Sequence, residues 1–131
     1  MIKTTLPIIE KSIDEKTKTL IVKESEIEVT IDTSLFAEER WEKYFPDTAK
    51  RETLFAYIER FKNDGFLTDK AKVVSSLKAL YCFMEGDNIA DFKSFCQLFD
   101  IAQGEYLNRL IDKIKFIFEI ALSSSTTDSK N

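Results

Sequence analysis

The sequence predicts an α+β fold that is mostly helical: an N-terminal β-hairpin or three-stranded meander followed by about five packed helices. Residues 1–32 hold β-branched and apolar residues in short runs with few helix signals, whereas apolar residues recur every three or four positions within residues 33–122. The composition agrees, because the chain of 131 residues is 44% hydrophobic and holds only three glycines and two prolines. We therefore expect a single domain over residues 1–122, with a β segment followed by a helical body.

The β segment divides into three candidate strands, Leu6–Ile13, Thr17–Lys23 and Glu26–Asp32. The third is the clearest, because its isoleucines and valine alternate with glutamate and threonine, as in a half-buried strand. The candidate turns are Asp14–Lys16 and Glu24–Ser25, although neither contains Gly or Asn. A small sheet of this kind is marginal alone, so one of its faces should pack on the helices.

Helix signals begin at Thr33 or Ser34, either of which can cap a first helix that Pro46 ends. Asp47 is expected to cap a second helix, which Asn63-Asp64-Gly65 stops. The residues expected on the buried faces of these two helices are Ala37, Trp41, Tyr44, Phe45, Leu54, Phe55, Ile58 and Phe61.

A third helix is expected to begin near Thr68 or Asp69 and to end at Gly86, and a short fourth helix to start at Asp87 or Asn88. The third has the cleanest amphipathic pattern in the chain and should lie in the core together with the last helix. Their expected inner faces consist of Val73, Val74, Leu77, Leu80, Tyr81 and Met84, then Phe92, Phe95, Cys96 and Phe99.

The last helix should run to about Leu122 from a capping box formed by Asp100 and Gln103, and the polar residues 123–131 should form a disordered tail. Two residues of this helix, Phe116 and Ile120, fall outside its main apolar stripe. That stripe consists of Leu107, Leu110, Ile111, Ile114, Ile117, Phe118 and Ala121.

An excess of apolar surface on the last helix has three explanations. The helix is central in the bundle, or Phe116 and Ile120 contact the N-terminal strands, or they form an interface with a partner or a second copy of the chain. With Ile117 and Lys113, these two residues are the candidates for protein binding.

The sequence gives little support for a catalytic function, because the chain contains no histidine, the commonest general base and metal ligand near neutral pH. The cysteines Cys82 and Cys96 lack a Cys-x-x-Cys pair and are expected to be buried core residues. The acidic pairs Glu38/Glu39 and Asp87/Asp91 are explained by helix starts. The isolated glycines form no phosphate loop. We therefore expect no enzyme activity, no cofactor and no metal.

The charge balance argues against nucleic acid, because a net charge of −4 from 19 basic and 23 acidic residues offers no field for phosphates. The aromatic residues Trp41, Tyr44 and Phe45 beside Arg40 and Lys43 could stack bases, but core packing is the favoured interpretation. The sequence has no apolar run near eighteen residues and no signal peptide at its N-terminus, so no membrane span and a cytoplasmic location are expected.

Three segments in order, SLFAEERWEKYFPDTAKRETLFAYIERF, SSLKALYCFMEG and DFKSFCQLFD, are followed by a last helix rich in Ile and Phe. Over residues 33–122 this pattern resembles the tail assembly chaperones of long-tailed bacteriophages and prophages of Gram-positive bacteria. The resemblance consists of apolar and aromatic positions and includes no catalytic signature.

The resemblance implies a protein of the host bacterial cytoplasm that binds the long helical tape measure protein and keeps it soluble until the tail tube polymerises. The major tail tube protein would be a further partner, and self-association of the chaperone would allow it to coat its client. The alternative function is a homo-oligomeric structural or adaptor protein of a phage tail, of the tail-completion type.

Overall fold

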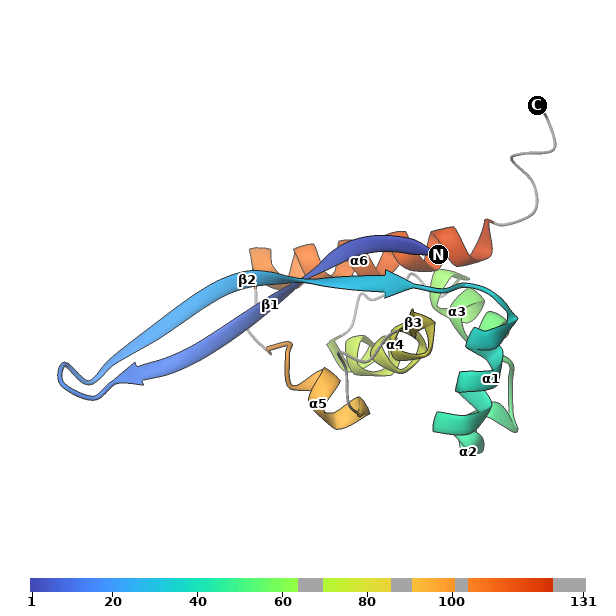
Figure 1. Ribbon diagram of the computed structural model, residues 1–131, viewed down its shortest axis with the longest axis horizontal. Helices are drawn as coiled ribbons and strands as arrows, with labels where there is room; N and C mark the ends of the chain where they lie inside the picture. Colours follow the sequence, from blue (N-terminus) through green and yellow to red (C-terminus); the bar gives the residue numbers. More distant parts are fainter. Residues whose placement is uncertain (64–69, 86–90, 101–103, 124–131) are drawn as a thin grey trace, which may run out of the picture.

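The computed structural model describes residues 1–63, 70–85, 91–100 and 104–123, and shows a long N-terminal hairpin followed by a helical body (Figure 1). This arrangement confirms the expected α+β fold, with one more short helix than the sequence indicated. The elements are β1 (Ile2–Asp14), β2 (Thr19–Ile31), α1 (Leu35–Tyr44), α2 (Pro46–Ala49), α3 (Leu54–Asn63), α4 (Lys70–Phe83), β3 (Met84–Glu85), α5 (Phe92–Cys96) and α6 (Glu105–Leu122).

The two long strands pair antiparallel without interruption over all 13 residues of each. The expected turn at Glu24–Ser25 is wrong, because both residues lie inside β2, and the N-terminal three-stranded meander is wrong with it. Neither residue forces a turn, and polar side chains are compatible with a strand whose faces reach solvent. The third strand of the sheet is instead β3, which follows α4 and pairs with Thr30 and Ile31 at the end of β2.

The hairpin turn is built without Gly or Asn. One carboxylate oxygen of Asp14 accepts hydrogen bonds from the backbone N–H groups of Lys16 (3.0 Å) and Thr17 (3.4 Å). Lys18 then adopts a left-handed conformation with φ 57°, which a residue with a Cβ adopts rarely. The side chain of Asp14 thus supplies the turn chemistry that the sequence seemed to lack.

Helix α4 is the centre of the body, because it contacts α1, α3, α5 and α6. The expectation that this helix lies in the core is confirmed, with two exceptions: Val74 faces solvent, and Met84 belongs to β3. The one buried hydroxyl on this helix, that of Ser76, donates to the carbonyl of Val73 at 2.6 Å. The buried residues of α4 are Val73, Ser76, Leu77, Ala79, Leu80, Cys82 and Phe83.

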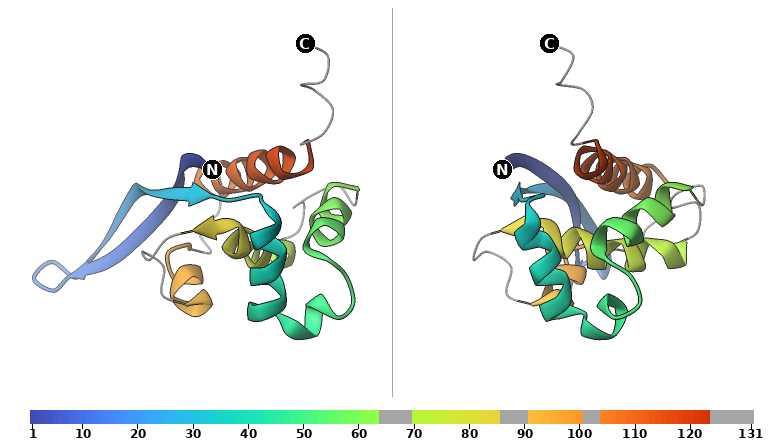
Figure 2. Two further views of the ribbon diagram at one scale, coloured as in Figure 1. Left: turned by 45° about the vertical axis from the view of Figure 1, so that its right-hand side comes forward. Right: turned by 90° about the vertical axis from the view of Figure 1, so that its right-hand side faces the viewer.

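Helix α6 packs against the first half of β1 (Figure 1), and Figure 2 shows the two elements from two further directions. The Tyr106 hydroxyl donates to the carbonyl of Pro7 at 3.2 Å, and Lys113 Nζ donates to Thr4 Oγ1 at 3.0 Å. Only one side of α6 enters the core, so the explanation that it is the central helix is wrong. Its buried residues are Tyr106, Leu110, Ile114, Ile117 and Phe118.

In the first half of the helical body, the observed helix starts agree only in part with those expected from the sequence. Ser34 caps α1 as expected, and α1 ends just before Pro46. Asp47 does not cap the next helix, because Pro46 occupies the first turn of the separate short helix α2. A new start at Leu54 changes the rotation of α3, so Phe55 is exposed. Two expected core residues, Tyr44 and Phe55, are thus exposed, and Tyr57 is buried instead.

In the second half of the helical body, the observed helix starts differ more from the expected ones. Asp91 caps α5 by accepting the N–H of Ser94 at 2.6 Å. Asp100 does not cap α6, because the helix starts at Glu105 after Gly104, whose φ of 82° favours glycine. The expectations for residues 64, 65, 68, 69, 86–88 and 103 and for the tail 124–131 fall outside the described residues.

Candidate protein-binding surfaces

The four candidate residues of α6 lie in different environments. The side chain of Phe116 is 50% exposed and that of Ile120 is half-buried, so both reach the surface. Ile117 is only 1% exposed because it points into the core, so it contributes no accessible surface for the contact with a partner that the sequence suggested. Lys113 is half-buried and hydrogen bonded to Thr4, so it holds α6 on β1. The accessible part of this candidate site is therefore Phe116 with the edge of Ile120.

A larger apolar surface lies between α1, α3 and the end of α6, and we name it the α1–α3 groove. It encloses about 190 Å³. Leu35 on α1, at 87% exposed, and Phe55 on α3, at 49% exposed, line it together with buried residues. Its apolar floor is formed by Ala37, Leu54, Ile58, Phe83 and Ala121.

The groove follows from the local starts of its two helices. Ser34 caps α1 through its hydroxyl, which accepts the N–H of Phe36 at 3.3 Å, and this start leaves Leu35 and Phe36 in the first turn facing solvent. Glu38 then reaches across to α3, where its two carboxylate oxygens accept the N–H groups of Leu54 and Phe55, each at 3.0 Å. The α3 N-terminus is thereby fixed against α1, and the walls of the groove are held in place before any partner binds.

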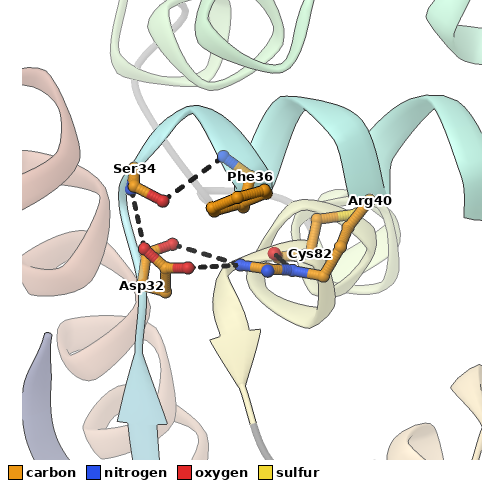
Figure 3. A network of polar contacts seen from close by, with 5 residues as sticks. All are labelled: Asp32, Ser34, Phe36, Arg40 and Cys82. Atoms are coloured by element: carbon orange, nitrogen blue, oxygen red, sulfur yellow. Dashed lines mark hydrogen bonds and ion pairs between the residues drawn. The ribbon is translucent and has the colours of Figure 1, made fainter.

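A polar network fixes α1 on the rest of the body (Figure 3). Arg40 Nε donates to the carbonyl of Cys82 at 2.6 Å, and its guanidinium contacts the carboxylate of Asp32 at 3.4 Å. The other carboxylate oxygen of Asp32 accepts the N–H of Ser34 at 2.9 Å, and the backbone N–H of Asp32 donates to the carbonyl of Phe83 at 2.6 Å. One aspartate and one arginine thus join the ends of β2 and α4 to the start of α1.

The protonation of Asp32 reflects this network. Burial alone would raise the pKa of its carboxyl group, but the hydrogen bonds from Ser34 and the nearby Arg40 guanidinium outweigh burial and hold the pKa below 3.8. Asp32 is therefore ionised near neutral pH, and Ser34 and Arg40 stabilise its negative charge. The geometry is that of a structural clamp, since both side chains of the ion pair are largely shielded from water.

A second apolar hollow of about 170 Å³ lies between α4 and the segment that leads into α6. Val74 projects into it from α4, where the sequence predicted a buried position. Cys96 also lines it, and burial raises the pKa of its thiol. The remaining apolar lining consists of Val73, Leu77, Phe99, Leu107 and Leu110.

The tip of the hairpin is a third exposed apolar surface, and it projects beyond the helical body (Figure 1). The run Leu20-Ile21-Val22 beside a strand turn is the sequence signal of this surface, and none of the expected binding residues lies in it. The tip surface consists of Ile13, Leu20, Ile21 and Val22, each about half exposed or more.

The aromatic residues beside Arg40 and Lys43 are mainly core residues, as the favoured interpretation required. Trp41 is fully buried, packs on Phe45 and Tyr57, and donates its indole N–H to the carbonyl of Glu52 at 3.0 Å. A fully buried indole is not available to stack on a base.

The reactive groups in the described residues have structural roles. Burial raises the pKa of the Cys82 thiol to about 12, and both cysteines are free. In the described ranges no three acidic or cysteine side chains come together as a metal site. Among the same residues, every buried side-chain nitrogen or oxygen has a hydrogen-bond partner. No described helix has the length and apolar character needed to cross a membrane.

Comparison of the chain with protein-family models, with curated proteins and with solved structures gave no match. The surfaces themselves define the class of site: shallow, apolar and without a converging set of ionisable groups in the part of the chain that the structure describes.

Proposed function

We propose that the protein is a non-catalytic binding protein, and specifically a tail assembly chaperone of a long-tailed phage or prophage. It binds amphipathic helical segments of the tape measure protein in the α1–α3 groove and keeps that client soluble in the bacterial cytoplasm until the tail tube polymerises. The family resemblance of residues 33–122 suggests the client, and the groove supports the mode of binding.

The observation that carries the proposal is the exposure of Leu35 and Phe55 at a groove with fixed walls. Full burial of one such side chain is worth about 1.5–3 kcal/mol, so two exposed together are an unused source of binding free energy. An amphipathic helix presents apolar residues at i, i+3, i+4 and i+7, which suits a shallow apolar groove of this kind.

The fixed groove and the mixed surface charge also suit a client that is long and prone to aggregation. A preorganised groove binds without paying for the ordering of its own walls, and the Glu38 and Arg40 contacts provide that order. The mixed surface charge, 19 basic against 23 acidic residues, favours solubility of a chaperone loaded with client.

The test is co-expression with the tape measure protein encoded in the same genome, followed by measurement of the client's soluble fraction. We expect the wild-type chain to raise that fraction and the double variant Leu35→Ser/Phe55→Ser to lose most of the effect. Val74→Ser is the control, because it removes an exposed apolar side chain that does not line the groove. Unchanged client solubility, with no complex on a sizing column, would contradict the chaperone function.

The second candidate is a homo-oligomeric structural or adaptor protein of the tail, and the exposed apolar hairpin tip favours it. This candidate requires the polypeptide to be present in purified virions, whereas the chaperone leaves the particle before completion. Mass spectrometry of purified particles separates the two, since a stoichiometric amount of this chain in virions would support only the structural protein.

A further inference from the structure

The hairpin has an unpaired edge at its tip. The outer edge of β2 is covered by β3 only at Thr30 and Ile31, and the described part of the chain places no strand beside residues 19–24 of β2. The tip also extends past the helices (Figure 1). An exposed apolar strand edge of this kind is a template for pairing with another strand.

The cross-strand register gives the tip two different faces. Ile13 lies opposite Leu20, and Lys11 lies opposite Val22, so these four side chains share one face. Ile21 lies opposite Ser12 on the other face. The tip thus carries an apolar face and, on the reverse side, a single apolar residue, and neither face has helix packing to cover it.

We propose that two copies of this chain join through their hairpin tips, with β2 pairing antiparallel to β2 of the second copy about a two-fold axis at Ile21. This inference is independent of the chaperone function. It places the association at the hairpin and not on α6, whose polar contacts Tyr106–Pro7 and Lys113–Thr4 already hold it against β1.

The register centred on Ile21 is selected by complementarity. It sets Leu20 opposite Val22 of the second copy twice by symmetry, and Ile21 opposite its own counterpart once. It also brings Lys18, the turn residue just before β2, to the level of Glu24 of the second copy. A centre at Val22 would instead set Leu20 opposite Glu24. A centre between two residues is excluded, because residues opposite each other in an antiparallel pair must lie on the same face of the sheet.

The other strand of the hairpin is a poorer edge for the same purpose. A two-fold axis at Ser12 of β1 would bring Glu10 opposite Asp14 of the second copy, two like charges in each half of the interface. This repulsion between like charges directs the pairing to β2.

The shared sheet would cover the tip surface of both copies. Across four strands, one row reads Ile13, Leu20, then Val22 and Lys11 of the second copy, and the next row reads the same in reverse. Six apolar side chains are thereby gathered on one face between lysines. Antiparallel pairing sends the two helical bodies to opposite ends of this sheet, so they do not collide.

A disulfide at the two-fold axis tests the geometry directly. Residues opposite each other at such an axis have Cα atoms about 4.5–5.5 Å apart, within disulfide range. Ile21→Cys should give a covalent dimer under mild oxidation, and peptide mass spectrometry should show the bond between the two introduced cysteines. Ile13→Cys is the matched control, because Ile13 is at least as exposed as Ile21 but lies about 16 Å from its counterpart, across three strand spacings and two residues along the strand.

We expect at least ten times more covalent dimer from Ile21→Cys than from Ile13→Cys, and equal yields would overturn the proposal. In sedimentation of the unmodified chain, the average mass should rise with concentration toward twice 15.2 kDa. A mass that stays at 15.2 kDa throughout, or open-ended aggregation, would also overturn it.

Charge reversal tests the register without cysteine. Lys18→Glu and Glu24→Lys should each weaken the dimer several-fold, and the double variant should restore it, because the pair is only exchanged between copies. Glu24 also binds Arg109 within the chain, so circular dichroism must show that each variant is folded. A double variant that associates less than either single one would refute the Ile21-centred pairing.

Discussion

Glu38 of α1 caps the helix that begins at Leu54, sixteen residues further along the chain, with its Oε1 3.0 Å from the Leu54 nitrogen. The side chain thereby joins the two helices that form the walls of the α1–α3 groove. A carboxylate at a helix N-terminus satisfies free N–H groups and interacts favourably with the helix dipole.

We predict that Glu38→Ala lowers the free energy of unfolding by about 1–2 kcal/mol, the usual cost of losing a cap. Urea denaturation monitored by circular dichroism measures this change. Glu39→Ala is the control, because the neighbouring carboxylate is exposed and should change stability by less than about 0.5 kcal/mol. Equal effects of the two substitutions would show that the cap contributes nothing.

Asp32 provides a prediction about pH. Its pKa in the folded state lies below 3.8, so the stability it contributes is present above the unfolded pKa and is lost as the pH falls through the folded pKa. Asp32→Asn should therefore lower the free energy of unfolding by about 1.5–3 kcal/mol near neutral pH. This difference from wild type should shrink below pH 3.8.

Denaturation curves over this pH range, recorded for wild type and Asp32→Asn together, measure the difference. A constant difference down to the most acidic conditions would mean that the charge on Asp32 is irrelevant to its network with Arg40.

Phe116 and Ile117 are neighbours on α6 with opposite environments, so they allow a matched comparison. Ile117→Ala should destabilise the fold by about 2–5 kcal/mol, as expected for a large-to-small change in a packed core. Phe116→Ala should cost about 0.5 kcal/mol or less, because half of its side chain is already in water.

The double variant Phe116→Ser/Ile120→Ser should keep its helicity and lose client binding or self-association if this part of α6 contacts a partner. Loss of helicity would show instead that these two residues belong to the fold. Far-ultraviolet circular dichroism and sizing chromatography, applied to the same preparation, distinguish the two results.

The two cysteines should differ in reactivity. Cys82 is fully buried and the pKa of its thiol is raised to about 12, so almost none of it is thiolate near neutral pH. A thiol reagent should modify Cys96 first and Cys82 only when the protein unfolds. Rapid modification of both cysteines in the folded protein would contradict the burial of Cys82.

Local features were predictable from the sequence because local chemistry determines them. The Ser34 cap, the end of α1 before Pro46 and the apolar stripe of α6 depend on residues a few positions apart, and the structure contains all three. The α+β order is also a local property, since it follows from the change in hydrophobic period near residue 33.

Features that depend on distant segments were not predictable. The pairing of β3 with the end of β2 joins residues more than fifty positions apart, and the cap provided by Glu38 joins two helices. Phe55 fits a buried helical pattern, yet the restart of the chain at Leu54 rotates it to solvent. The candidate site was hard to predict for the same reason, because Ile117 and Phe116 cannot be assigned to core or surface until α6 is docked on β1.

The docking of α6 on β1 also has a consequence for the order of events during synthesis. The hydrogen bonds Tyr106–Pro7 and Lys113–Thr4 span 99 and 109 residues. Closing a loop of this length costs about 4 kcal/mol of conformational entropy, which only the subsequent packing of α6 on β1 offsets. On the ribosome, the hairpin and α4 emerge long before α6. Until α6 arrives, its buried residues are missing from the core cluster that also contains Leu6 and Val29, and incomplete cores of this kind favour aggregation of the nascent chain.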